Sequence, residues 1–112
     1  MNEIVEKARA IGADVETGIK RCAGKEDLYA KLIGTALKDK NFGVLKEKVL
    51  SKNVEGAFEA AHALKGVFSN LCLDPLAAQL SKVTEILRAG NLPEEEDMDT
   101  IERQKTEYMN IL

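Results

Sequence analysis

The 112-residue sequence has few of the residues that mark sheets, membrane spans or disulfide frameworks. It contains no tryptophan, two tyrosines, three phenylalanines and two prolines. This scarcity, beside abundant Ala, Leu, Lys and Glu, favours an all-α fold. No apolar run approaches the roughly 20 residues that span a bilayer, and the acidic, polar N-terminus does not resemble a signal peptide. We therefore expect a soluble, cytoplasmic protein that binds no membrane.

Charge and cysteine content exclude further classes of protein. The net charge of −3 argues against a nucleic-acid-binding protein, which normally carries a basic stripe. Cys22 and Cys72 lack CxxC spacing, so they predict neither a disulfide framework nor a metal site. We interpret them as free thiols in a reducing cytoplasm. With 45% hydrophobic and 31% charged residues, the chain has a globular composition, and its length predicts one domain over residues 1–112.

Hydrophobic periodicity predicts helices joined by short turns. Residues 13–27, which contain Gly18 and Gly24, are predicted to form a connection with a weak helical turn. Asp74 is predicted to cap the helix that follows it, with Pro75 in the first helical position. Short turns make neighbouring helices antiparallel, which predicts an up-and-down bundle over about 25–111. The predicted helices are a short N-terminal one over about 2–11, then 25–38, 42–50, 54–71, one from Asp74 to about Gly90, and a last one opened by Pro93.

The only histidine, His62, lies on the predicted helix 54–71 but away from its apolar face. At about 100° per residue, the apolar residues of this helix fall within an arc of roughly 80°, and His62 lies at least roughly 100° from each of them. This placement weakens the interpretation of His62 as a hydrogen-bonded core residue. Two interpretations remain, a functional histidine and a surface histidine placed by chance. The apolar residues are Ala57, Ala61, Leu64, Phe68 and Leu71.

Gly66 favours the functional interpretation of His62. Glycine inside a helix costs about 1 kcal/mol relative to alanine, so it calls for a local reason. At i+4 it stands beside the imidazole, where it leaves room for an approaching group; close helix packing is the alternative. Lys65 can bring an ammonium group to an incoming anion, and Ser69 can donate a hydrogen bond. An exposed imidazole, an open neighbour and a cation suit a histidine that accepts a phosphoryl group.

The stretch HALKGVFSNL, His62 to Leu71, resembles the signature of histidine-containing phosphotransfer (HPt) domains, roughly H-x-L-K-G-x-x-x-x-L-G. LYAKLIGTALKD is similar to the second helix of that family, and DPLAAQLSKVTEILRAG to the helix after the active one. The resemblance implies an antiparallel four-helix bundle with an additional short N-terminal helix. Cys72 replaces the glycine that usually follows the second leucine of the motif, which puts the turn at the helix end in question.

The resemblance also implies roles for individual residues. His62 would be the phosphoacceptor, Lys65 would stabilise the phosphohistidine, and Gly66 would give a receiver domain access to the ring. Ser69 is the matching small polar position one turn further on. We add the hypothesis that Glu59 orients the imidazole through Nδ1. Residues bordering His62, such as Glu55, Glu59, Phe58 and Val67, would determine partner specificity.

The leading hypothesis is therefore a stand-alone phosphorelay protein that exchanges a phosphoryl group between response-regulator receiver domains and His62. A hybrid histidine kinase is a further candidate partner. No cofactor or metal is expected on this chain, because Mg²⁺ would come from the receiver. We expect a monomer. We also expect no autonomous kinase activity, because the motif differs from that of histidine-kinase dimerisation domains and no nucleotide-binding glycine motif follows. One alternative is a non-catalytic helical adaptor. A hydrolase is a more remote alternative, because the sequence shows no second base that could support hydrolysis.

Overall fold

The computed structural model describes residues 2–112, and Met1 lies outside the described residues. The described residues form seven helices and no strand, which confirms the predicted all-α class. Two helices precede the segment predicted as the bundle, where one was expected, and the predicted connection over 13–27 contains the second of them. The helices are α1 (Glu3–Ala10), α2 (Val15–Arg21), α3 (Glu26–Leu37), α4 (Asn41–Leu50), α5 (Val54–Asn70), α6 (Asp74–Arg88) and α7 (Glu95–Met109).

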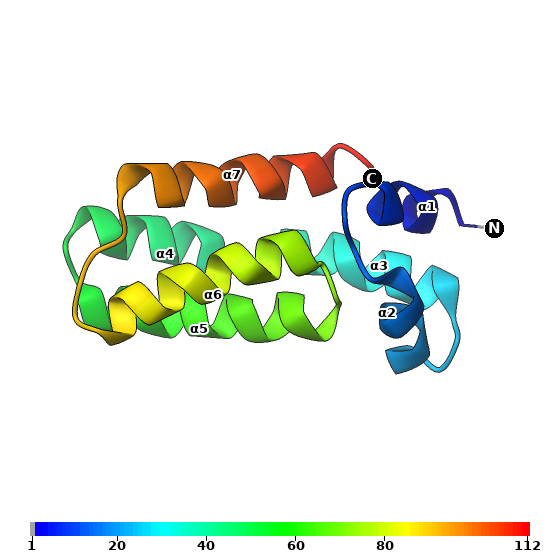
Figure 1. Cartoon of the computed structure of the whole chain (residues 1–112), viewed down its shortest axis with the longest axis horizontal. Helices are drawn as coiled ribbons and strands as arrows, with labels where there is room; N and C mark the ends of the chain where they lie inside the picture. Colours follow the sequence, from blue (N-terminus) through cyan, green and yellow to red (C-terminus); the bar gives the residue numbers. More distant parts are fainter. Residues whose placement is uncertain (1) are drawn as a thin grey trace.

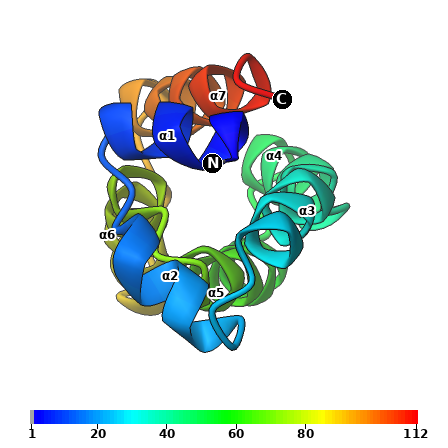
Figure 2. The same ribbon diagram turned by 90° about the vertical axis from the view of Figure 1, so that its right-hand side faces the viewer.

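Helices α4, α5, α6 and α7 lie side by side and alternate in direction along an elongated molecule of 44 × 23 × 20 Å (Figure 1). The closest packing is between α5 and each of its neighbours, α4 and α6, while α7 contacts α6. Helix α3 precedes α4 and runs in the same direction, and it contacts α7. Viewed along the long axis, α1 and α2 lie at the end of the molecule that also holds the C-terminus (Figure 2). Helix α5 therefore has one side covered by neighbours along most of its length.

The core follows the predicted periodicity closely on α5 and less well elsewhere. All five residues predicted for the apolar face of α5 are buried. On α3 the buried residues are Tyr29, Ala30, Ile33, Ala36 and Leu37, whereas the apolar side chains of Leu28 and Leu32 are 40% and 38% exposed. Leu112, also apolar, follows the end of α7 and is 52% exposed.

The ends of α5 and α6 depend on specific cap geometries. Asn53 caps α5, because its Oδ1 accepts a hydrogen bond from Gly56 N at 2.9 Å. The prediction for α6 is wrong by one residue, since Leu73 is the cap and Asp74 is the first helical residue. The reason lies just upstream, where Cys72 adopts φ +58° in the turn between α5 and α6, and the buried Leu73 becomes the cap residue.

Helix α2 packs against α3 through a glycine. A Cβ atom built on Gly18 would lie 2.4 Å from the ring of Tyr29, so only glycine fits at this crossing. The Tyr29 hydroxyl then reaches past α2 and donates a hydrogen bond of 2.6 Å to the carbonyl oxygen of Leu71 at the end of α5. Arg21 of α2 donates to the carbonyl oxygens of Ser69 and Asn70 at 3.1 and 3.0 Å. Helices α2 and α3 thus stabilise the C-terminal end of α5.

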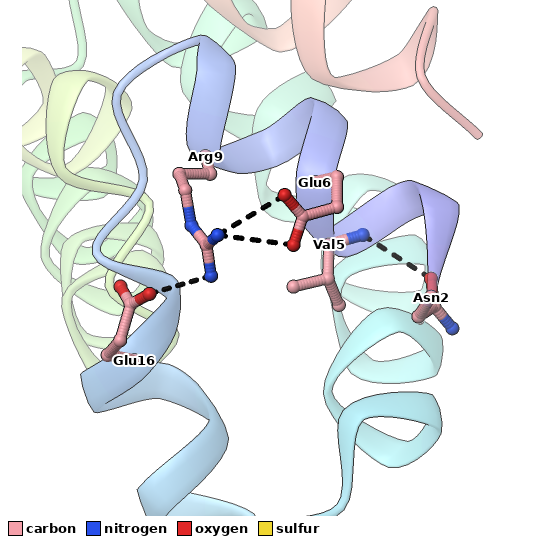
Figure 3. Close-up of polar contacts among 5 residues, drawn as sticks. All are labelled: Asn2, Val5, Glu6, Arg9 and Glu16. Carbon is pink, nitrogen blue, oxygen red and sulfur yellow. Dashed lines mark hydrogen bonds and ion pairs between the residues drawn. The ribbon is translucent and has the colours of Figure 1, made fainter.

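The junction between α1 and α2 is polar and exposed. Arg9 forms ion pairs with Glu6 on its own helix, at 3.2 Å, and with Glu16 on α2, at 2.6 Å (Figure 3). Asn2 caps the start of α1 by accepting hydrogen bonds from Ile4 N and Val5 N at 2.9 and 3.3 Å. Exposed ion pairs contribute roughly 0–1 kcal/mol each, so the buried Tyr29 contact matters more for holding α2 and α3 against α5.

A pair of tyrosine-to-phenylalanine variants tests the importance of the Tyr29 hydrogen bond. Tyr29→Phe leaves the buried Leu71 carbonyl without that donor and is expected to lower the free energy of unfolding by roughly 1–3 kcal/mol. Tyr108→Phe is the matched control, because the Tyr108 hydroxyl is equally buried but has no hydrogen-bond partner among residues 2–112. We expect it to be neutral or stabilising in urea denaturation. Equal losses in the two variants would contradict this assignment.

The start of α7 gives a pH-dependent contribution to stability. Asp97 Oδ1 lies 2.9 Å from Lys82 Nζ, and its Oδ2 accepts a hydrogen bond from Glu94 N at 3.1 Å. The Lys82 ammonium group, followed by the backbone donor, holds the pKa of Asp97 below its usual value despite burial of the carboxylate. The charged form is therefore favoured in the folded state.

Asp97→Asn is expected to lower the free energy of unfolding at pH 7 by about 1–2 kcal/mol. Because the folded pKa of Asp97 is below the unfolded value of about 3.9, the stabilisation is fully present above that pH. It should be lost as the pH falls through the folded pKa, so the wild type and the variant should converge in acid. Urea denaturation as a function of pH measures this difference, and a difference that stays constant down to acid pH would exclude the ion pair as its origin.

Candidate functional site

The candidate site lies on the side of α5 that faces away from the buried helix contacts. His62, Gly66 and Ser69 are exposed and Lys65 is half-buried. These residues occupy positions i, i+3, i+4 and i+7 of one helix, which places them on one side over two turns. The apolar face of α5 is buried against neighbouring helices. This packing fixes the rotation of α5 about its axis, so the side that carries His62 must face outward. All four residues predicted from the sequence are thus brought together.

The imidazole of His62 is oriented by an aromatic neighbour. The rings of Phe58 and His62 are 5.6 Å apart between centroids and tilted by 10°, an offset-stacked arrangement. Within residues 2–112, no side chain or backbone group forms a hydrogen bond to the imidazole of His62. The predicted contact in which the Glu59 carboxylate orients the imidazole is therefore absent, and the ring lies against Phe58 at i−4 instead. The stack of Phe58 on His62 could have been predicted, because the two residues are four positions apart on one helix.

Gly66 has no packing partner within the described chain. A Cβ atom built at this position would have no atom outside its own helical surroundings within 4 Å, in contrast to Gly18. Close helix packing, the alternative explanation for this glycine, is therefore excluded among residues 2–112. A helical side chain leans toward the N-terminal turn, so a larger residue at position 66 would cover the surface next to His62. The glycine leaves that surface open.

Lys65 and Ser69 border this opening. Lys65 forms no ion pair with any residue of the described chain, so its ammonium group is available to an incoming anion. The Ser69 side chain is exposed, and the backbone carbonyl oxygen of Ser69 accepts a hydrogen bond from Arg21 of α2. Sequence reasoning missed Arg21, because nothing in the local pattern indicates that α2 reaches the end of α5. The site therefore combines a nucleophilic ring, an open neighbour, a cation and a hydroxyl.

Two shallow hollows lie along α5 on either side of His62. The first is bounded by residues of α5 and of the end of α6, and the second by residues of α3 and of the end of α5. The first is lined by Val54, Glu55, Phe58, Leu87, Arg88 and Gly90, and the second by Leu32, Thr35, Ala36, Asp39, Val67, Asn70 and Leu71. Phe58 and Val67, both predicted to border the site, form part of these surfaces.

Neither cysteine is part of the candidate site. Cys22 and Cys72 are buried free thiols, and burial raises the pKa of the Cys72 thiol. Cys72 has the left-handed backbone conformation that glycine adopts most easily, at the position where the HPt motif has glycine. The replacement therefore keeps the turn, at a backbone cost, and its side chain points into the protein rather than toward His62. No group of three or more His, Cys, Asp and Glu side chains in residues 2–112 is arranged to hold a metal ion.

Comparison with protein families assigns the chain to a family. The family model described as Hpt domain matches residues 27–107, well over half of the chain. The chain belongs to the Hpt domain family. No curated protein and no solved structure was found to match it. No helix among residues 2–112 has the length and apolar character needed to cross a bilayer.

Membership of this family defines the general function. Hpt domains act in phosphotransfer during phosphorelay signalling, as phosphocarriers rather than kinases. Their partners are response-regulator receiver domains and histidine kinases.

Proposed function

We propose that this protein relays a phosphoryl group between receiver-domain aspartates through His62. The observation that carries the proposal is the placement of the only histidine on the exposed side of α5, with an unobstructed glycine one turn away. An exposed histidine placed by chance would need neither the glycine nor the adjacent lysine, which forms no ion pair among residues 2–112. The family membership supplies the reaction class, and the site supplies the residues.

The transfer is a displacement at phosphorus. The lone pair of a neutral imidazole nitrogen of His62 forms a P–N bond, while the P–O bond to the receiver aspartate breaks and the carboxylate leaves. Lys65 would meet the negative charge of the phosphoryl oxygens, and Ser69 would donate a hydrogen bond to them or to the partner. Gly66 would allow the receiver backbone to approach the ring. The reverse displacement passes the group to a second receiver.

The same proposal covers cofactors, architecture and location. We expect Mg²⁺ on the receiver, where it would neutralise phosphoryl charge, and no cofactor or autonomous kinase activity on this chain. Helices α3 and α4 together, α5, α6 and α7 would serve as the four members of an antiparallel bundle within one domain. Two free buried cysteines suit the reducing cytoplasm, and a monomer would leave the side of α5 that carries His62 free for partners.

Incubation with a phosphorylated receiver domain tests the proposal. The wild-type chain should acquire phosphate that is lost in acid and retained in base, as expected for a phosphohistidine. Incubation with ATP alone should leave it unlabelled. If receivers bind the chain but no phosphate moves to it, the adaptor alternative is correct. If ATP alone labels it, the assignment as a carrier without kinase activity is wrong.

A further inference from the structure

The orientation of the His62 ring depends on one contact. Phe58, one turn earlier on α5, lies almost parallel to the imidazole at 5.6 Å between ring centroids. Because no hydrogen bond within the described residues fixes the exposed ring, the stack with Phe58 is what restricts its rotation. Side chains in a helix lean toward its N-terminus, which brings His62 onto Phe58 and away from Gly66. One face of the imidazole is therefore covered while the side toward Gly66 stays open.

Phe58 is itself held by a neighbouring helix. It is half-buried and packs against the hydrophobic core, and the guanidinium carbon of Arg88 on α6 lies 5.0 Å from the centroid of its ring. Arg88 Nε in turn donates hydrogen bonds to the carboxylate of Glu85 at 3.2 and 3.3 Å. A cation over an aromatic ring is attracted to its negative face. The orientation of His62 is thereby connected to α6 through Phe58.

We propose that Phe58, held in place by Arg88, is a positioning residue that presents His62 to the incoming phosphoryl group. This inference rests on the proposed function, because it assigns Phe58 a part in the same transfer. Stacking on Phe58 covers one face of the ring and limits its rotation, while the surface at Gly66 stays open to the phosphoryl group. A nucleophile that is already oriented loses less conformational freedom when the transfer geometry forms.

A spectroscopic test follows the orientation of the ring without any partner. Protons of His62 that lie over the Phe58 ring should resonate upfield of their positions in an unfolded chain. In Phe58→Leu, which keeps an apolar side chain of similar size, these protons should move downfield. Phe58→Tyr is the conservative control and should preserve the upfield position. Unchanged His62 resonances in Phe58→Leu would overturn the proposal.

A kinetic test measures the consequence for transfer. We expect Phe58→Leu to lower kcat for transfer from a phosphorylated receiver by about three- to tenfold, with KM nearly unchanged. Phe58→Tyr should restore the rate, and Arg88→Gln should give a smaller loss in the same direction. Phosphorylation by phosphoramidate, a small donor that needs no receiver, should slow in parallel. A raised KM with an unchanged phosphoramidate rate would show that Phe58 acts in receiver docking, and would overturn the positioning role.

These three measurements, the His62 resonances, the transfer from a receiver and the phosphoramidate reaction, separate this inference from the proposed function. If no receiver transfers phosphate to the wild-type chain, the proposed function fails, while the resonances and the phosphoramidate reaction still report on Phe58. If the wild type is labelled on His62 but Phe58→Leu behaves like it in all three measurements, the relay stands and the positioning role is wrong. Thermal unfolding of each variant verifies that its α5 is folded during these measurements.

Discussion

A His62→Gln variant is expected to take up no phosphate from a phosphorylated receiver domain under conditions that label the wild type. Glutamine keeps a similar length and polarity but has no ring nitrogen to act as a nucleophile. Because the sequence contains a single histidine, no second histidine can replace it. Acid-labile radiolabel on the chain, measured against time, gives the result directly.

The fold should survive this change. His62 is exposed, and the stack with Phe58 is its one aromatic contact in the described chain, so the free energy of unfolding should change by about 1 kcal/mol or less. Glu59→Gln is a matched control one turn away, because its carboxylate forms no hydrogen bond to His62; it should be labelled like the wild type. Full labelling of His62→Gln would remove His62 from the reaction, and loss of labelling in Glu59→Gln would restore the original hypothesis that Glu59 orients the ring.

Much of the site was predictable because it lies within one helix. The period of α5 determines which residues face the core, and it correctly excluded His62 from the buried face. The same period places Lys65, Gly66 and Ser69 near His62, as the structure shows. The resemblance to the family rested largely on these residues, because the motif consists of residue types at fixed spacings along one helix. The stack of Phe58 on His62 also follows i, i+4 spacing and could have been predicted.

The contacts that support the site from other helices were not predictable in this way. Arg88 reaches Phe58 because of the register between α5 and α6, and Arg21 reaches the end of α5 because α2 folds across it. Gly18 was interpreted as part of a connection with a weak helical turn, whereas it lies inside α2 and permits contact with Tyr29. A glycine that ends a helix and one that allows close packing are identical in sequence. Only the neighbouring helix distinguishes them.

The turn between α5 and α6 shows the same limit. The family motif predicted a glycine where this chain has Cys72, and the structure gives Cys72 the left-handed conformation that glycine would adopt. Sequence periodicity placed the start of α6 one residue late, because it could not detect this turn or the burial of Leu73. Non-glycine residues in this conformation cost roughly 1–2 kcal/mol, so the chain tolerates a cost here that its pattern does not reveal.

Gly66 should show opposite effects on stability and on transfer. Gly66→Ala is expected to raise the free energy of unfolding by up to about 1 kcal/mol, because alanine is the better helix former and its Cβ meets no other atom within 4 Å. Gly66→Gln should also be at least as stable as the wild type. Both variants place a side chain over the surface next to His62, so both should accept phosphate more slowly. Urea denaturation and receiver-dependent labelling measure the two effects.

The size of the effect should follow the size of the side chain. We expect a modest loss for Gly66→Ala and roughly a hundredfold loss for Gly66→Gln, since a displacement of about 1 Å from the transfer geometry can cost that much. Gly43→Ala on α4 is the matched control, because Gly43 is also an exposed helical glycine with nothing within 4 Å of a built Cβ atom. It should gain stability without any loss of transfer.

The comparison of the two glycines isolates the reason for Gly66. If Gly66→Gln is stable and accepts phosphate at the wild-type rate, access to the ring does not depend on this glycine. If the two alanine variants gain similar stability and only Gly66→Ala slows transfer, the chain retains a glycine inside α5 at a cost in stability that serves the approach to His62. The helix-weakening residue is then explained by the reaction at its neighbour, because no contact within the described chain requires it.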